Sequence, residues 1–156
     1  MIQIILSRNL KGGMELTTKN TNDLRQELAE TADLDYFLES NVDSFQMESA
    51  TDLLSRFIQE KGISKAVLAK NSGMSEVYLH QLFSRRRSPS RSRLISLCFG
   101  LSLTLEESQL LLRRSGHAEL YPHNRRDAIL IYGLIHGMDI FEINDRLFEK
   151  GEEPLF

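Results

Sequence analysis

The chain has 156 residues, of which 41% are apolar and 26% charged, so it is long enough for one domain with a substantial core and an extension. Its single cysteine, Cys98, excludes an internal disulfide and fits a reducing compartment, so we expect a cytoplasmic protein. No apolar run approaches the roughly 18 residues that a membrane-spanning helix needs. The net charge of −3 argues against nucleic-acid binding only if the charge is evenly spread.

The charge is distributed very unevenly along the sequence. Residues 61–93 contain eight Lys or Arg and a single acid, Glu76, whereas residues 14–60 contain three basic and eleven acidic residues. Residues 94–156 contain six basic and ten acidic residues. Because a phosphate backbone responds to the local potential and not to the total charge, the basic window is a candidate for nucleic-acid binding.

Residues 1–45 form an acidic N-terminal extension. A lysine and two glycines precede the second methionine of the chain, Met14, which suggests that translation starts there and that residues 1–13 are untranslated leader or disordered. Beyond them, apolar spacing predicts one helix over residues 23–39, with Leu24, Leu28, Tyr36 and Phe37 on its apolar face.

Helical periodicity continues almost without interruption after residue 45, and signals for strands are scarce, so we predict an all-α fold. The predicted helices cover residues 47–61, 64–71, 75–84, a segment from Ser90 or Ser92 to about Leu101, and a segment from Thr104 to Gly116. Hydroxyl residues at the predicted starts and glycines at several predicted ends are the usual helix boundary signals.

The two helices over residues 64–71 and 75–84 carry the most specific pattern. Gly73 suits the left-handed position that ends the first helix, and Ser75 is a good N-cap for the second. Ala69 is small enough to let two helices cross closely. A steeply crossed helix pair with arginines after its second member is typical of proteins that place a helix in the major groove of DNA.

The second helix of this pair leaves polar and small apolar side chains outside. Leu79 and Leu82 are expected to point inward, so the candidates for reading base edges are Glu76, Val77, His80 and Gln81. A glutamine pairs with adenine, a glutamate accepts from the cytosine amino group, and an aliphatic side chain contacts the thymine methyl group. The acidic Glu76 also leaves open the alternative that the protein is a scaffold that kept this fold and lost DNA affinity.

Phosphate contacts are expected from basic side chains and from two serines at helix N-termini. The candidates are Ser64, Lys65, Lys70, Ser75, Arg85, Arg86, Arg87, Arg91 and Arg93. A solvated turn is the alternative interpretation of the arginine run, but five arginines within nine residues favour phosphate binding.

Residues 46 to about 116 resemble the lambda repressor-like helix-turn-helix domain of the XRE family, on the basis of Ala69, Gly73, Ser75, Leu79 and Leu82 at the family spacing. The wider stretches 84–91 and 120–128 are similar to bacterial XRE regulators with an extended helical C-terminus. The resemblance implies a five-helix DNA-binding domain, here residues 46–121, whose third helix enters the major groove, usually in a dimer. The family often has Gln where this chain has Lys65, which favours a phosphate contact at that position.

The C-terminal third contains an internal repeat with an offset of 35 residues. Residues 91–121 align with residues 126–156, and the matched pairs include Leu94 with Ile129, Leu112 with Leu147, and Gly116 with Gly151. Each copy is expected to form two helices and a folded-back tail that ends in an apolar–aromatic pair. Residues 122–156 are therefore predicted to form an additional helical hairpin that packs on the DNA-binding domain. Chance similarity between two amphipathic hairpins is the alternative.

Other chemistries are weakly indicated. No phosphate-binding glycine loop or nucleophile motif is present, and His117, His123, His136 and Cys98 lack the spacing of metal ligands, so we expect no enzyme activity, no metal and no cofactor. Ser88 and Ser90 follow three arginines and are candidate phosphorylation sites, although helix capping or phosphate contact is the more economical role for them.

We therefore expect a cytoplasmic, homodimeric, sequence-specific DNA-binding transcriptional regulator, a repressor that reads the major groove with residues 75–84. The dimer contact is expected from the C-terminal hairpin or the N-terminal helix. The alternative is a protein-interaction adaptor or antitoxin-like module whose acidic N-terminal segment binds a partner protein. That segment is also a candidate to compete with DNA for the basic surface.

Overall fold

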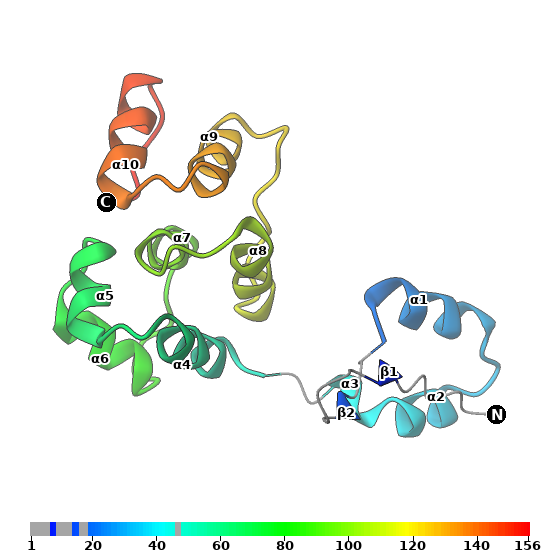
Figure 1. Ribbon diagram of the computed structural model, residues 1–156. Coiled ribbons are helices and arrows are strands. Elements are labelled where there is room, and N and C mark those ends of the chain that lie inside the picture. The colour runs from blue at the N-terminus through cyan, green and yellow to red at the C-terminus, as the bar shows by residue number, and fades with distance from the viewer. Residues whose placement is uncertain (1–6, 9–13, 16–18, 46–47) are drawn as a thin grey trace. The chain divides into compact units, whose positions relative to one another are not determined.

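The computed structural model describes residues 7–8, 14–15, 19–45 and 48–156, and it divides into two compact units, Met1–Met47 and Glu48–Phe156 (Figure 1). The fold is all-α, as predicted; the short strands β1 (Ser7–Arg8) and β2 (Met14–Glu15) form one antiparallel pair. Most of the segment predicted to be leader or disordered, residues 1–6 and 9–13, lies outside the described residues. None of the described helices has the length and apolar content that crossing a bilayer requires.

The described part of the first unit contains three short helices, α1 (Thr21–Glu30), α2 (Leu34–Ser40) and α3 (Val42–Phe45). The prediction of one helix over residues 23–39 is therefore wrong. Thr31 ends α1 with an extended backbone, and the side chain of Asp33 caps α2 by accepting from the Tyr36 N–H (3.1 Å). A local hydroxyl and carboxylate that bond to nearby backbone groups offer the chain a turn in place of a continuous helix.

The second unit contains seven helices, and each begins after a side-chain N-cap. They are α4 (Ala50–Lys61), α5 (Lys65–Asn71), α6 (Glu76–Phe83), α7 (Arg91–Gly100), α8 (Leu105–Arg114), α9 (Arg125–Ile135) and α10 (Ile140–Glu149). The helix pattern predicted for residues 64–84 and 90–116 agrees with these bounds to within a few residues, because the capping serines and threonine fix where each helix starts.

Helix α7 lies at the centre of the second unit, between α5 and the pair α9–α10 (Figure 1). Seven of its residues, Leu94–Gly100, are buried, including Cys98. At its C-terminal end Gly100 meets Ser72, the residue that follows α5, so closely that a methyl group on Gly100 would overlap the Ser72 Oγ. Glycine is needed here for close approach of two helices and not for an unusual backbone angle.

The two C-terminal hairpins share the same local structure at an offset of 35 residues. Helix α7 corresponds to α9, and α8 to α10, with the same positions at both helix ends apart from one extra residue at the start of α9. A capping box opens the second helix of each copy, formed by Thr104 with Glu107 and by Asp139 with Glu142. The offset therefore relates backbone hydrogen-bonding features as well as apolar positions.

The folded-back tails are held by equivalent hydrogen bonds. Arg91 Nε donates to the Ala118 carbonyl (2.9 Å), and Arg126 Nε donates to the Glu153 carbonyl (2.8 Å), 35 residues later. An amide side chain on the second helix accepts from a leucine N–H near the end of each tail, in the pairs Gln109–Leu120 and Asn144–Leu155 (2.7 Å in both).

Candidate nucleic-acid interface

The turn between α5 and α6 is short and tightly specified. Gly73 has φ = +65°, in the left-handed region that favours glycine, and the Ser75 hydroxyl accepts from the Tyr78 N–H (3.1 Å) at the start of α6. The Phe156 ring lies against Gly73, so a Cβ there would also collide with an aromatic side chain. This turn sets the angle at which α6 leaves α5 and keeps the N-terminal half of α6 exposed.

Helix α6 buries one face and exposes the other. Leu79 and Leu82 are buried, as predicted. Of the predicted base-reading residues, Glu76, Val77 and His80 are exposed, and Gln81 is half-buried. Val77 is 66% exposed and is therefore accessible to a ligand.

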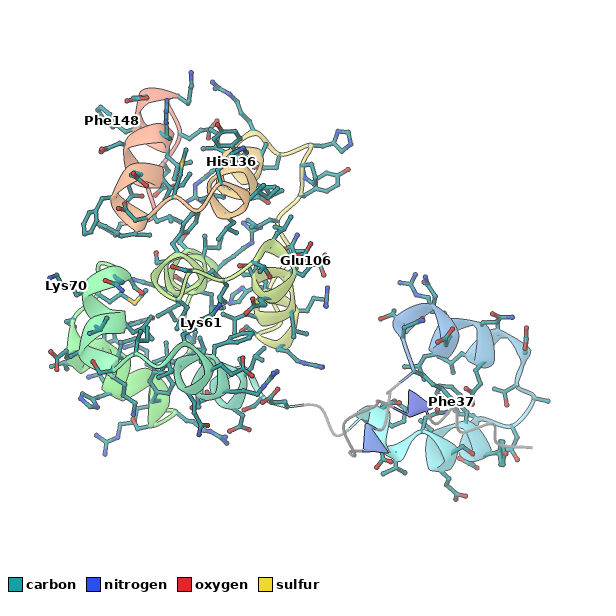
Figure 2. All side chains as sticks on the ribbon, in the orientation of Figure 1. Phe37, Lys61, Lys70, Glu106, His136 and Phe148 are labelled. Carbon is teal, nitrogen blue, oxygen red and sulfur yellow. The ribbon has the colours of Figure 1, made fainter. Side chains whose placement is uncertain are left out.

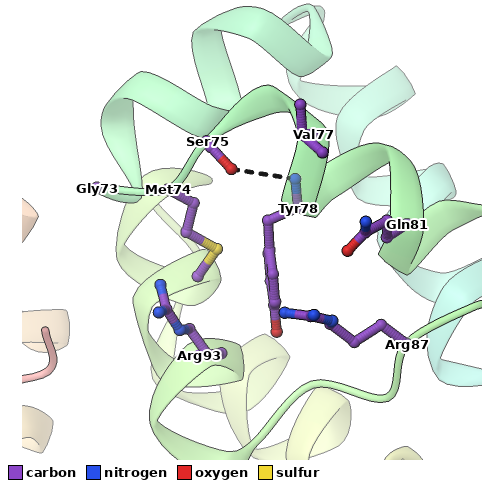
Figure 3. Close-up of a pocket in the computed structure, with 8 residues that line it drawn as sticks. All are labelled: Gly73, Met74, Ser75, Val77, Tyr78, Gln81, Arg87 and Arg93. Atoms are coloured by element: carbon purple, nitrogen blue, oxygen red, sulfur yellow. Dashed lines mark hydrogen bonds between the residues drawn. The ribbon is translucent and has the colours of Figure 1, made fainter.

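A tyrosine that the sequence did not single out forms the centre of this surface. The Tyr78 ring lies between the guanidinium groups of Arg87 and Arg93, whose Cζ atoms are 5.5 and 5.1 Å from the ring centroid (Figure 3). Both distances are within the range of cation–π attraction. The loop arginine and the α7 arginine are thereby held on two sides of one aromatic platform.

These side chains surround a hollow that opens to solvent. Its volume is about 460 Å³, and it is lined by Gly73, Met74, Ser75, Val77, Tyr78, Gln81, Arg87 and Arg93 (Figure 3). The hollow thus combines two predicted base-reading residues, a helix N-terminus and two guanidinium groups. No carboxylate lines it.

The other predicted phosphate contacts surround the same helix pair. Lys65 Nζ lies 4.7 Å from the centroid of the Phe83 ring, which holds it beside α6, and Lys70 points outward from α5 (Figure 2). Arg86 is exposed. Arg85 has φ = +62° at the end of α6, and its guanidinium makes an exposed ion pair with Asp52 on α4 (3.4 Å). Such a pair contributes little and leaves Arg85 able to change partner.

Arg91 is the exception among the predicted phosphate contacts. Its guanidinium makes a bidentate ion pair with Asp127 (2.8 and 3.1 Å) and also donates to the carbonyl groups of Ala118 and Glu119. The carboxylate of Asp127 is almost fully buried, with 8% of the side chain exposed. Arg91 therefore holds the tail of the first repeat onto α9, and we remove it from the candidate interface.

The serines have mainly capping roles. The hydroxyl groups of Ser64 and Ser90 accept from the backbone N–H groups of Val67 and Arg93 (3.2 Å in both), at the starts of α5 and α7. Ser88 is exposed in the loop between α6 and α7. A phosphate group on Ser90 would have to replace the capping contact, whereas one on Ser88 would not.

The remaining candidates for chemistry are the single cysteine and possible metal ligands. Burial raises the pKa of the Cys98 thiol to about 12, so this side chain is a packing group and a poor nucleophile. Within the part of the chain that the structure describes, no three His, Cys, Asp or Glu side chains gather in a way that would hold a metal ion.

Comparisons with known proteins add no assignment to this geometry. No family model matches the chain, and neither the curated proteins nor the solved structures include a significant match.

Proposed function

We propose that the second unit is the sequence-specific DNA-binding module of a transcriptional regulator and that α6 enters the major groove. The observation that carries this proposal is the Tyr78 platform, which holds Arg87 and Arg93 beside the exposed residues of α6. The resemblance of the α5–α6 pattern to the XRE, lambda repressor-like family supports the same function. A repressor that acts in the bacterial cytoplasm as a homodimer is the form that this resemblance favours.

The charge around α5 and α6 supports phosphate binding. Lys65 and Lys70 lie on α5, Arg86 and Arg87 lie in the loop after α6, and Arg93 lies on α7. Glu76 is the one acid of residues 61–93. Two guanidinium groups fixed on an aromatic ring have lost much of their conformational freedom before binding, so less entropy is lost when they contact phosphates.

Base reading is assigned to the exposed part of α6. Gln81 opens onto the hollow next to Val77, which allows a bidentate pair with adenine beside an apolar contact with a thymine methyl group. Glu76 stands in the first turn of α6, where it repels phosphates but accepts from a cytosine amino group. We therefore expect sequence preference at two or three adjacent base pairs in each half-site.

Replacing Gln81 with alanine should weaken binding to the preferred DNA sequence by about 5- to 150-fold, because one bidentate base contact contributes about 1–3 kcal/mol of discrimination. The preferred sequence is first selected by the full-length protein from a random DNA pool. Affinity for that sequence and for an unrelated duplex is then measured at a fixed salt concentration. Gln59→Ala, at an exposed position on α4, is the matched control.

The two variants separate specific from non-specific binding. Gln81→Ala should lose preference for the selected sequence and keep its affinity for the unrelated duplex, whereas Gln59→Ala should keep both. Equal behaviour of the two variants would show that Gln81 reads no base. In a dimer, the selected sequence should contain two half-sites one DNA turn apart, roughly 34 Å.

A second candidate function, protein interaction through the acidic first unit, is favoured by its exposed apolar surface. Among the described residues of this unit, Phe37 is the buried apolar side chain, whereas six large apolar side chains are between 43% and 60% exposed, namely Leu28, Leu34, Tyr36, Leu38, Val42 and Phe45. An exposed apolar surface on a small acidic module suits a protein partner. If the peptide 14–45 does not fold by itself and orders only with a partner protein, this function gains support.

A further inference from the structure

In the contact between the two C-terminal repeats, the first helix of each repeat packs against the second helix of the other. Helix α10 packs against α7, and α9 packs against α8. Since α7 corresponds to α9 and α8 to α10, interchanging the repeats reproduces the same two contacts. This exchange of contacts is the pattern that an approximate two-fold axis between the repeats gives, with each repeat using the same face against the other. The faces that point away from this contact are equivalent too.

In the first repeat, the face of α7 that points away from α9 and α10 is covered. The Arg93 guanidinium lies over Tyr78 of α6, and Gly100 contacts Ser72 at the end of α5. Leu97 lies between these two positions on the same helical face and is 0% exposed. Helices α5 and α6 are thus the elements that cover this face.

In the second repeat, the equivalent face of α9 has no cover within the second unit. Ala128, Tyr132 and Ile135 occupy the positions of Arg93, Leu97 and Gly100, and we call them the α9 stripe. Tyr132 is 52% exposed and Ile135 62% exposed. The His136 ring stacks on the Tyr132 ring, with centroids 4.0 Å apart, on the side of the repeat away from α7 (Figure 2).

We propose that the α9 stripe pairs with the α9 stripe of a second copy of this chain, with the two helices antiparallel. The stripe is complementary in size to itself about the middle of α9, which falls between Ala128 and Tyr132. An antiparallel pair places the large Tyr132 ring of each copy over the small Ala128 of the other. Such an interface is isologous, because each copy contributes the same residues.

The charge at the ends of α9 fits the same orientation. Arg125 is the first residue of α9 and lies on the same helical face as the stripe. Its side chain is 68% exposed, and it forms an ion pair with Glu152 of the same chain (3.6 Å). In an antiparallel pair, Arg125 lies beside Ile135 and the last carbonyl groups of α9 in the other copy. The negative end of a helix dipole favours a cation at that position. A parallel pair would instead bring the two Arg125 side chains together.

The proposed contact is small, and its strength should reflect that. A helix of 11 residues is about 16 Å long, so a pair of them buries less than the roughly 1,600 Å² of a standard stable interface. We therefore expect micromolar or weaker self-association of the free protein. Two copies that bind neighbouring half-sites on DNA would be held at a high effective concentration, which strengthens the same contact.

Sedimentation equilibrium of the full-length protein without DNA, at concentrations up to about 1 mM, tests this proposal. The wild type should associate to dimers, and Tyr132→Glu should raise the dimer dissociation constant by about tenfold or more, because it places unpaired charges inside the contact. Phe148→Glu introduces the same charge at a residue of α10 that is 77% exposed and should leave the constant unchanged. Thermal unfolding of each variant shows whether the fold is retained.

The orientation is tested separately with single-cysteine variants, since the native Cys98 is fully buried. A mixture of Ala128→Cys and Tyr132→Cys proteins should cross-link with a short bismaleimide faster than either variant alone. A parallel pair would instead cross-link each variant with itself.

A wild-type protein that stays monomeric up to the highest concentration would overturn the proposal, and so would dimers that Tyr132→Glu does not weaken. Both measurements are made without DNA. Their failure would therefore leave the proposed DNA-binding function standing, and loss of DNA binding would not by itself exclude the pairing.

Discussion

Replacing Arg91 with leucine should lower the free energy of unfolding of residues 48–156 by about 3 kcal/mol, near the low end for breaking a buried ion pair because Arg91 is 27% exposed. The substitution leaves the buried carboxylate of Asp127 with one remaining donor, the Tyr121 N–H (3.0 Å). It also frees the carbonyl groups of Ala118 and Glu119. Denaturant unfolding followed by circular dichroism measures the change.

The internal repeat supplies the matched control. Arg126→Leu removes the equivalent guanidinium, which donates to the carbonyl groups of Glu153 and Pro154 and makes no ion pair among the described residues. We expect a loss of only about 1 kcal/mol, the contribution of ordinary hydrogen bonds. Equal losses for the two variants would contradict the central role of the Arg91–Asp127 pair.

The same ion pair makes stability depend on pH. Burial alone would raise the pKa of Asp127, but the hydrogen bonds from Arg91 and the Tyr121 N–H, with the nearby positive charges, outweigh it and hold the pKa below its ordinary value of 3.8. The stabilising contribution is therefore complete above that value and is lost as the pH falls through the lower pKa of the folded state. The free energy of unfolding of the Arg91→Leu variant should therefore depend much less on pH in this acidic range.

Gly100→Ala should destabilise the second unit by about 1–3 kcal/mol, the usual effect of overpacking a core. Rotation of the Ser72 hydroxyl can relieve its overlap with the new methyl group. The Ser72 Cβ and backbone N would still lie at 3.1 and 3.2 Å from it, and these atoms move only with the backbone of the α5–α6 turn. Thermal and denaturant unfolding of the purified variant measure the effect.

A second substitution tests the assigned cause. The Ser72 hydroxyl is buried without a hydrogen-bond partner among the described protein groups, so its removal breaks no hydrogen bond. Ser72→Gly removes both the hydroxyl and the Cβ, and it should recover part of the stability in the Gly100→Ala background. If the two losses simply add, the Gly100–Ser72 contact is not the source of the destabilisation.

Much of the second unit could be predicted from sequence because its helix boundaries are determined by residues that lie close to them in sequence. Ser64, Ser75, Ser90 and Thr104 cap the helices that were expected to start near them. Leu79 and Leu82 are buried, as the helical periodicity of α6 predicts. These features depend on residues within about one helical turn, and so does the helix-start pattern that predicts them.

The errors come from contacts that are distant in sequence or from competing local bonds. Arg91 stands among basic residues in sequence, but its ion-pair partner Asp127 is 36 residues away. Tyr78 was overlooked because its importance depends on Arg87 and Arg93, which a loop brings to either side of the ring. The break at Thr31–Asp33 reflects a turn whose local bonds compete with the helix that apolar spacing predicts.

The salt dependence of DNA affinity tests the proposed function most directly. The protein with Arg86→Gln and Arg87→Gln is compared with wild type and with a protein carrying Arg113→Gln and Arg114→Gln, which removes the same charge from the end of α8. Each lost phosphate contact should reduce the slope of log K against log salt by about 0.9. The Arg86/Arg87 variant should therefore show a slope shallower by about 1.8 and weaker binding, whereas the α8 variant should match wild type. Equal slopes for the two variants, or no binding by the wild type at low salt, would contradict the assignment of this surface to DNA.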